Sequence, residues 1–272
     1  ISKEVQGRIK KYYNRDAEVV YPPIELDDRK WKMENRNLKV EDRSSIYPLN
    51  SSVKNPASTF NHLSSNDYFL IVSRLVPYKR VDLAISAFNK LKLPLKIVGM
   101  GSEEKRLKAM AGQTIEFLGY LTQEELVRYY KGCRALVFPG IEDFGLAILE
   151  AQSFGKPVIA FRGGGALETI IDGKTGIFFN EQAVESLIQA IRQFNSLVID
   201  PKECIQQTSK FNFEKFKEQF LNEILKQVQA FGSEAQARRD DKIIKFLMPK
   251  EALDYLLENL KGGEVVLFKG AR

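Results

Sequence analysis

Residues 68–99 read YFLIVSRLVPYKRVDLAISAFNKLKLPLKIVG, and this stretch decides the fold. It opens on a continuous apolar run with β-branched residues, which is typical of a strand buried on both faces. Apolar side chains then recur along one face of a helix, at Val81, Leu83, Ala84, Ala87, Phe88 and Leu91. A second apolar run follows at residues 93–99. This succession predicts a right-handed β-α-β unit with parallel strands.

The same alternation continues along the chain. Strand-like apolar runs return at residues 114–121, 135–140, 157–161 and 175–179. Helical segments lie between or after them, at residues 103–111, 123–132, 146–155, 166–171 and 183–194. Six β-α units in a row predict an α/β fold with a doubly wound, Rossmann-like parallel sheet over about residues 68–195.

The composition excludes several chemistries. The chain of 272 residues has one histidine, His62, and two cysteines, Cys133 and Cys204. A structural zinc site made of Cys and His is therefore excluded, and a catalytic triad would have to use His62. We predict neither a metal site nor a resident cofactor. Two cysteines in a chain of this length favour a reducing cytoplasm over a disulfide framework, and Cys133 is interpreted as a small buried hydrophobe.

The formal net charge is +6, from 41 Lys and Arg against 35 Asp and Glu. This balance suits a phosphorylated small molecule, an anionic membrane surface or nucleic acid. Nucleic acid is not the predicted partner, because the basic residues are spread along the chain without the aromatic patterns of RNA-binding modules. Peripheral docking on the inner leaflet and a solvated basic surface both stay open. No apolar run approaches the ~20 residues that a membrane span needs.

The chain is predicted to have four segments. Residues 1–26 contain a helix at 1–13 and a short strand at 17–21. Residues 27–67 are polar and without a sustained period, which predicts a loop or tether. Residues 68–232 form the main domain and end in a long helix at 212–231, whereas 233–272 form a linker and a small C-terminal β-α-β unit. Since the first residue is Ile1, we expect the chain to be a fragment or a processed product.

Two cations follow the first strand of the predicted sheet. Ligands of an open parallel sheet bind outside the carboxyl ends of its strands, so the residues after each strand are the candidates. Arg74 and Lys79 lie there and lead into the next helix. Cations beside a helix N-terminus can hold a diphosphate. A solvated basic turn is the alternative.

Glycines follow two other strands. Gly99 and Gly101 form half of a dinucleotide fingerprint, without the third glycine or a downstream acid, so the pattern indicates a tight turn open to a ligand rather than an NAD site. The run Gly163–Gly165 removes side chains at another strand-helix junction. A flexible turn is the alternative for that run.

Two carboxylates accompany the fourth strand. Glu142 lies in the loop after it, and Glu150 lies in the otherwise apolar helix LAILEAQSFG. A carboxylate in a buried helix needs hydrogen-bond donors, which the hydroxyl groups of a ligand would supply. A capping Glu142 and a Glu150 paired with a basic side chain are the alternative.

Four segments of the chain resemble a known family. They are SRLVPYKRVDLAISAF (73–88), KIVGMGSEEKRL (96–107), IEFLGYLTQEEL (115–126) and the long run from Phe138 to Phe179. Together they resemble the C-terminal, donor-binding domain of GT-B retaining glycosyltransferases of the nucleotide-sugar group, closest to a mannosyltransferase branch. Glu142 and Glu150 match the E-x7-E motif of that group.

The resemblance implies roles for the candidate residues. Arg74 and Lys79 would stabilise the departing diphosphate, and Glu142 would contact hydroxyls of the donor sugar. These three are the implied catalytic residues. The implied donor-binding and nucleotide-binding residues are Gly99, Gly101, Tyr120, Leu121, Phe144, Gly145, Leu146 and Glu150, with Glu150 holding the ribose hydroxyls.

The resemblance also implies a function. A hexose, with mannose from GDP-mannose as the preferred donor, would pass with retention to a glycan or lipid-linked acceptor. Members of the family have two Rossmann-like domains, so this chain would supply the donor half and would need the missing N-terminal domain for transfer. Residues 1–26 also resemble the segment that leaves the first of these domains and enters the second, so they are interpreted as a remnant of, or crossover from, that missing domain. We therefore expect the chain to be part of a longer enzyme. A non-catalytic nucleotide-binding module of Rossmann type is the alternative.

Overall fold

The computed structural model describes residues 1–24 and 68–235. The chain divides into two compact units, Ile1–Asn212 and Phe213–Arg272. The predicted tether at 27–67, the β-α-β tail beyond residue 241 and His62 lie outside the described residues.

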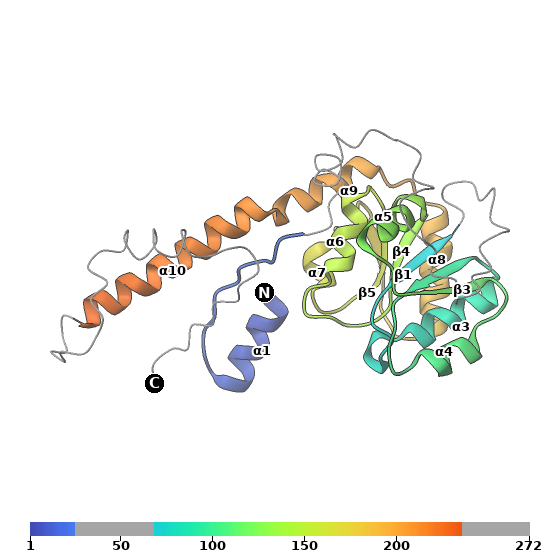
Figure 1. Cartoon of the computed structure of the whole chain (residues 1–272), viewed down its shortest axis with the longest axis horizontal. Coiled ribbons are helices and arrows are strands. Elements are labelled where there is room, and N and C mark those ends of the chain that lie inside the picture. Colours follow the sequence, from blue (N-terminus) through green and yellow to red (C-terminus); the bar gives the residue numbers. More distant parts are fainter. Residues whose placement is uncertain (25–67, 236–272) are drawn as a thin grey trace, which may run out of the picture. The chain divides into compact units, whose positions relative to one another are not determined.

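A six-stranded parallel sheet forms the centre of the first unit (Figure 1). Its strands are β1 (Phe69–Val72), β2 (Leu95–Val98), β3 (Ile115–Gly119), β4 (Ala135–Phe138), β5 (Val158–Phe161) and β6 (Gly176–Phe179). The strand order is β3-β2-β1-β4-β5-β6, and every neighbouring pair is parallel. The predicted α/β, doubly wound fold is therefore confirmed.

The winding direction reverses between β1 and β4. Phe69 of β1 aligns with Leu95 of β2 on one side and with Ala135 of β4 on the other. The chain first adds β2 and β3 on one side and then returns to add β4 to β6 on the opposite side. The loops after β1 and β4 diverge at this point, which makes the carboxyl ends of these two strands the expected ligand crevice.

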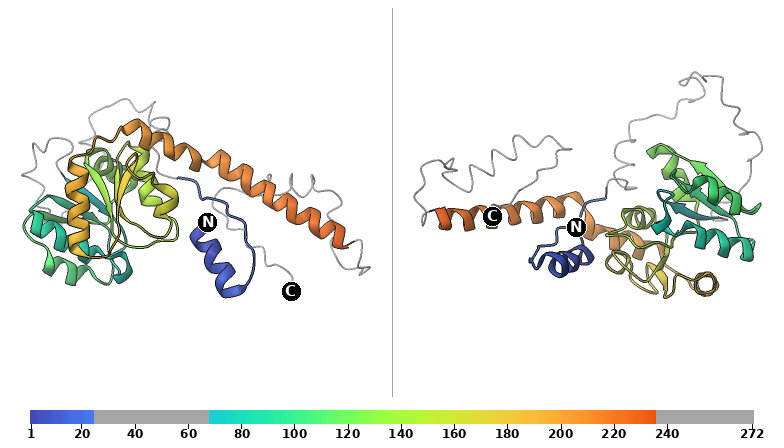
Figure 2. Two further views of the ribbon diagram at one scale, coloured as in Figure 1. Left: turned by 180° about the vertical axis from the view of Figure 1, so that it is seen from behind. Right: turned by 90° about the horizontal axis from the view of Figure 1, so that it is seen from below.

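Helices cover both faces of the sheet (Figure 2). One layer contains α3 (Val81–Leu91), α4 (Glu104–Met110) and α8 (Val184–Asn195), and the other contains α5 (Gln123–Gly132), α6 (Leu146–Ser153) and α7 (Ala166–Thr169). Phe69 and Ile71 pack in the first layer, and Leu70 between them packs in the second. Apart from the edge strand β3, whose residues are all partly exposed, the strands are buried on both faces, which explains why they are apolar runs rather than alternating ones.

Two cysteines are buried in this core. Cys133 caps the end of α5 and is 0% exposed, and Cys204 lies in α9 (Pro201–Thr208) at the same exposure. Burial raises the pKa of each thiol to about 12, so both stay neutral at physiological pH. The interpretation of Cys133 as a small buried hydrophobe is confirmed.

Helix α1 (Lys3–Tyr13) confirms the helix predicted at the start of the chain. Its N-cap residue Ser2 accepts a hydrogen bond from the backbone N–H of Val5, and Asn14 ends the helix in the left-handed conformation. The strand predicted at residues 17–21 is wrong, because these residues form no ladder with any described strand. A strand needs a neighbour for its backbone groups. Here the carbonyl of Ala17 instead accepts a hydrogen bond from the Gln6 side chain, at 2.5 Å.

Two short elements after α8 were not predicted from the sequence. Helix α9 and the 3-10 turn η3 (Ser209–Phe211) follow Asp200, whose side chain caps α9 by accepting from the N–H of Lys202. Asp followed by Pro at the first helical position was the local signal. Helix α10 (Phe213–Ala235) continues through Gly232, past the predicted end at 231.

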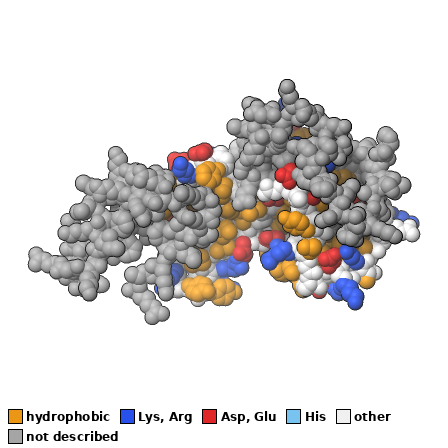
Figure 3. All heavy atoms as spheres, in the orientation of Figure 1, with side chains coloured by type: hydrophobic (Ala, Val, Ile, Leu, Met, Phe, Trp, Pro, Cys, Tyr) orange, Lys and Arg blue, Asp and Glu red, His pale blue; other side chains and the backbone are white. Residues whose placement is uncertain are grey.

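The surface of the described residues carries charges of both signs on the face drawn in Figure 3. Figure 3 shows Lys and Arg side chains interspersed with Asp, Glu and hydrophobic ones on the face that it draws. Among the helices of residues 1–24 and 68–235, none has both the length and the apolar character to cross a bilayer.

Candidate functional site

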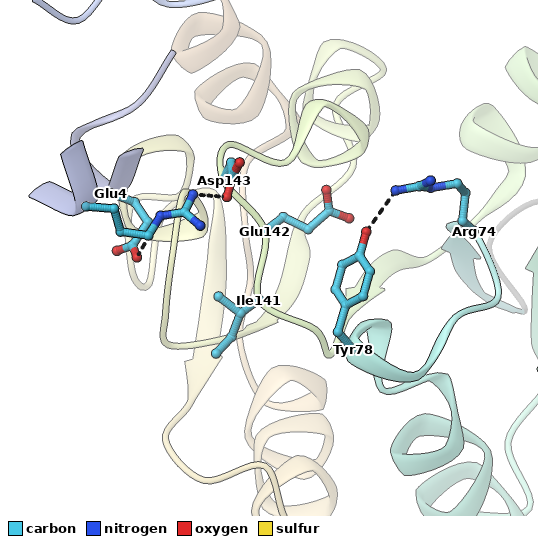
Figure 4. Close-up of a pocket in the computed structure, with 7 residues that line it drawn as sticks. Glu4, Arg74, Tyr78, Ile141, Glu142 and Asp143 are labelled. Atoms are coloured by element: carbon cyan, nitrogen blue, oxygen red, sulfur yellow. Dashed lines mark hydrogen bonds and ion pairs between the residues drawn. The ribbon is translucent and has the colours of Figure 1, made fainter. Parts of the chain in front are cut away.

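A pocket of about 400 Å³ lies between the loops that follow β1 and β4. Its volume is in the range of small-molecule sites. Arg74 and Tyr78 come from the first loop and Glu142 from the second, and Figure 4 shows the Glu142 side chain pointing toward the other two. The full lining is Glu4, Arg8, Arg74, Tyr78, Ile141, Glu142 and Asp143. The pocket is therefore at the point where the winding of the sheet reverses.

Lys79 and Glu142 form an ion pair beside this pocket. Lys79 ends the short 3-10 turn η2 (Pro77–Lys79), and its side chain is 8% exposed, against 28% for Glu142. Burial and, to a smaller extent, the charge of Arg74 lower the pKa of Lys79 from 10.5 to about 8, although Asp143 acts in the opposite direction. The structure thus brings two predicted catalytic residues together and holds a buried ammonium group at the pocket edge.

Arg74 is an exposed cation on the same loop. Its guanidinium donates a hydrogen bond to the hydroxyl of Tyr78 at 2.9 Å. The ammonium of Lys79 lies 4.9 Å from the centre of the same tyrosine ring. Tyr78 therefore contacts both predicted phosphate-binding cations, a role that the sequence analysis did not assign.

Glycines allow neighbouring loops to touch at this edge of the sheet. A Cβ on Gly140 would lie 2.7 Å from the Cα of Lys79, and a Cβ on Gly165 would lie 2.2 Å from the Cα of Phe144. The backbone N–H of Gly165 donates to the carbonyl of Glu142 at 2.8 Å. The loop that carries Glu142 is thus fixed from both sides. The loop that carries Glu142 is therefore what lies against the backbone of the Gly163–Gly165 run.

Gly99 and Gly101 make the corresponding contact on the other side of β1. A Cβ on Gly99 would lie 1.9 Å from the carbonyl oxygen of Ser73, and one on Gly101 would lie 2.2 Å from that of Leu75. Gly99 also has a φ of +129°, in the region that favours glycine. Protein backbone therefore accounts for both glycines, which shape the loop that carries Arg74.

Glu150 lies on α6, one turn after Leu146. Its carboxylate accepts a hydrogen bond from the hydroxyl of Tyr130 at 2.7 Å. Tyr130 is fully buried, and burial together with the adjacent carboxylate raises its pKa well above 10.0. The Glu150 carboxylate thus has a hydrogen-bond donor within the protein, the Tyr130 hydroxyl.

The remaining candidates lie in two places: Phe144, Gly145 and Leu146 follow β4, and Tyr120 and Leu121 follow β3. Phe144 is buried, whereas Gly145, with a φ of +86°, begins α6 without a side-chain cap and Leu146 follows it. Tyr120 is 76% exposed after β3, and Leu121 packs against a core cluster. The backbone N–H of Gly99 bonds to the carbonyl of Gly119 at 2.7 Å, which brings these two loops together.

Of the predicted site residues, Arg74 and Glu142 line the pocket itself. The sequence analysis assigned no role to Asp143, Ile141 or the two α1 residues Glu4 and Arg8. Asp143 could have been found by its place beside Glu142. The α1 pair could not, because Arg8 forms its ion pair with a residue 135 positions away.

The arrangement can bind a phosphorylated ligand that also has hydroxyl groups. Arg74 and Lys79 supply positive charge for phosphate oxygens, while Glu142 can accept hydrogen bonds from hydroxyls. Within the described residues, no cluster of His, Cys, Asp and Glu is placed to hold a metal ion.

The sequence profile of the family described as glycosyl transferases group 1 matches residues 58–211, more than half of the chain. The chain belongs to this family. The resemblance to GT-B retaining glycosyltransferases is thereby confirmed, and the matched region contains every strand of the sheet and the pocket loops of β1 and β4.

Curated relatives include enzymes that are named for different activities. The chain is 27% identical to an alpha-1,3/1,6-mannosyltransferase of Dictyostelium discoideum, over 80% of this chain and 57% of that protein. It is 31% identical to a GDP-mannose-dependent alpha-(1-6)-phosphatidylinositol monomannoside mannosyltransferase of Mycolicibacterium smegmatis, over 52% and 41%. It is 30% identical to a glycogen synthase of Pseudomonas syringae, over 58% and 36%. The chain thus spans about half or less of the length of these relatives.

The fold also matches solved structures. Sucrose-phosphate synthase of Thermosynechococcus elongatus superposes with a TM-score of 0.62 over 84% of this chain and 57% of that chain. Since the identity is 20%, this similarity establishes the shared fold alone.

Gly165→Ala tests the contact between the loops. The new methyl group would overlap the backbone of Phe144, so we expect the free energy of unfolding to fall by about 2–3 kcal/mol. Chemical denaturation followed by circular dichroism measures the change.

Gly7→Ala is the matched control, because nothing lies within 4 Å of the Cβ position on the exposed α1 helix. It should leave stability unchanged or raise it by about 0.5–1 kcal/mol. Equal stability of wild type and Gly165→Ala would contradict the role given to this glycine.

Proposed function

We propose that this chain is the donor-binding half of a retaining hexosyltransferase, which uses a nucleotide-diphospho-sugar. The observation that carries the proposal is the convergence of Arg74, Lys79 and Glu142 on one pocket edge at the switch point of the sheet. The family match supports the same activity. The remaining half of the reaction, including the acceptor site, is assigned to a further, N-terminal GT-B domain.

In this proposal the two cations stabilise the leaving group. The donor's anomeric carbon gains positive character as the bond to the diphosphate breaks, and negative charge builds on the departing phosphate oxygens. Arg74 and Lys79 are held in place before the reaction, so their charge helps without reorganisation. The diphosphate replaces Glu142 as the partner of Lys79, which leaves the Glu142 carboxylate to accept hydrogen bonds from sugar hydroxyls.

The nucleoside is assigned to the edge formed by the loops after β2 and β3 and by α6. Glu150, oriented by Tyr130, would bind the ribose hydroxyls, with Gly99, Gly101, Tyr120 and Leu121 near the nucleoside. Backbone amides near Phe144, Gly145 and Leu146 would support the phosphates or the sugar, because α6 begins on a glycine without a side-chain cap.

Mannose from GDP-mannose is the proposed donor, and a glycan or lipid-linked molecule is the proposed acceptor. Two of the relatives described above are named as mannosyltransferases, one of them GDP-mannose-dependent. The net charge of +6 supports a cytoplasmic enzyme at the inner face of an anionic membrane, where a lipid-linked acceptor would be found.

A nucleotide panel tests the proposal. We expect GDP to bind more tightly than UDP and ADP in calorimetry, and Arg74→Ala to weaken GDP binding at least tenfold by removing a charged hydrogen-bond donor. Glu150→Ala should lower the affinity for nucleotide and leave the affinity for inorganic diphosphate unchanged, because the contact assigned to Glu150 is with the ribose.

Arg192→Ala is the matched control, because it removes the same charge from an exposed position near the end of α8. It should bind GDP like wild type. No binding of any nucleotide would contradict the proposal, whereas binding without transfer in the full two-domain enzyme would favour the alternative of a non-catalytic nucleotide-binding module.

The affinity for GDP should depend on pH through Lys79. Its pKa of about 8 means that the free protein loses this proton as the pH rises through 8, whereas a bound diphosphate favours the charged form. Affinity is therefore greatest below pH 8, and we expect it to fall about tenfold between pH 7.5 and 9.5. Calorimetry in buffers of different ionisation enthalpy should detect proton uptake on binding near pH 8.

Lys79→Arg separates this effect from other titrations. A guanidinium stays charged over the whole range, so the variant should bind GDP with little change between pH 7.5 and 9.5. The same pH slope in both proteins would show that a different group titrates.

A further inference from the structure

Helix α1 begins on a carboxylate from a distant part of the chain. Glu168 of α7 accepts hydrogen bonds from the backbone N–H of Lys3 at 2.9 and 3.0 Å, and from that of Glu4 at 3.4 Å. The first N–H groups of a helix have no partner inside it, and the helix dipole favours an anion there. Ser2 provides the local cap through Val5, so Glu168 adds a second, long-range one.

Tyr21 ties the same carboxylate to the pocket loop. Its hydroxyl donates to Glu168 at 2.8 Å, and burial together with this carboxylate raises the pKa of Tyr21 to about 12. Its ring stacks on Phe144 at 5.6 Å and meets Phe211 edge-on at 5.4 Å. The backbone N–H of Ile24 donates to the carbonyl of Phe211 at 3.0 Å. Both ends of the segment 2–24 are therefore attached around the loop that carries Glu142.

Between these attachments, α1 presents charge to the pocket. Arg8 forms an ion pair with Asp143, the neighbour of Glu142, and both line the pocket with Glu4 (Figure 4). Asp143 is 58% exposed and lines the same pocket as Arg74, so its negative charge lies beside the space assigned to a diphosphate. Arg8 offsets that charge only while α1 is in place.

We propose that Glu168 is a positioning residue: it holds α1 so that Arg8 neutralises Asp143, and nucleotide binding and the seating of α1 therefore favour each other. The coupling rests on the proposed function, whereas the contact of Glu168 with α1 does not. Nucleotide binding must favour the seated position of α1 by the same factor by which seated α1 raises the affinity for nucleotide, because coupling between two sites is reciprocal.

The physical route runs through Asp143. Without Glu168, the N–H groups of Lys3 and Glu4 turn to water and α1 loses its attachment to α7. Arg8 then leaves Asp143, and the uncompensated carboxylate repels the phosphates of a bound nucleotide. Loss of a side chain outside the pocket lining thus weakens the ligand inside it.

Backbone hydrogen exchange of wild type and Glu168→Ala, each with and without GDP, tests the proposal. In the variant, we expect exchange at Lys3 and Glu4 to become at least tenfold faster and GDP affinity to fall three- to tenfold. In wild type, GDP should slow exchange at these two amides, and the variant should lose that response. A merely structural role for Glu168 would not make the protection depend on nucleotide.

Two further variants make the result specific. Glu185→Ala removes an exposed carboxylate that pairs with Lys90 on the outer helices, and it should change neither exchange at α1 nor GDP affinity. Asp143→Asn added to Glu168→Ala should restore GDP affinity toward the wild-type value, because it removes the repelling charge while α1 stays loose.

Unchanged exchange at Lys3 and Glu4 in Glu168→Ala would overturn the contact, and faster exchange with unchanged GDP affinity would overturn the coupling. If wild type binds no nucleotide, the proposed function and the coupling are both wrong. The exchange difference measured without nucleotide then still decides whether Glu168 holds α1.

Discussion

The loops at the carboxyl edge of the sheet touch one another backbone to backbone, and the absence of a Cβ at a few glycines permits this contact. Gly99 and Gly101 lie against Ser73 and Leu75, Gly140 lies against Lys79, and Gly165 lies against Phe144. The contacts follow the strand order β2-β1-β4-β5, so each loop positions the next one. The loops that surround the pocket are therefore closely packed against one another.

This close packing explains how the site can keep a charged side chain in one orientation before a ligand binds. Lys79 is nearly buried, which lowers its pKa to about 8, and it stays in place through Glu142 and the ring of Tyr78. A cation that is partly stripped of water and already oriented is well suited to an anionic leaving group. The Tyr130 hydroxyl likewise orients the carboxylate of Glu150 by donating a hydrogen bond to it. The acidic loop is further attached to α1 through Arg8 and Tyr21.

Much of this arrangement could be predicted from the sequence. Six apolar runs separated by amphipathic helices predicted the sheet, since strands covered on both faces cannot alternate in polarity. The rule that ligands bind at carboxyl ends then selected Arg74, Lys79 and Glu142. The prediction of a strand at residues 17–21 was wrong. Apolar β-branched residues favour an extended backbone, but a strand forms only where a neighbouring strand is available for pairing.

The sequence by itself determined the order of the elements and the residue types at each strand end. Only the tertiary structure decided which of these residues meet. Lys79 is separated from Glu142 by 63 positions and Arg8 from Asp143 by 135, and no local pattern encodes such pairs. The physical reason is that periodicity reports the burial of one segment at a time. An ion pair or a helix cap between distant segments depends on how closely their backbones approach, which the glycines at the sheet edge fix only after folding.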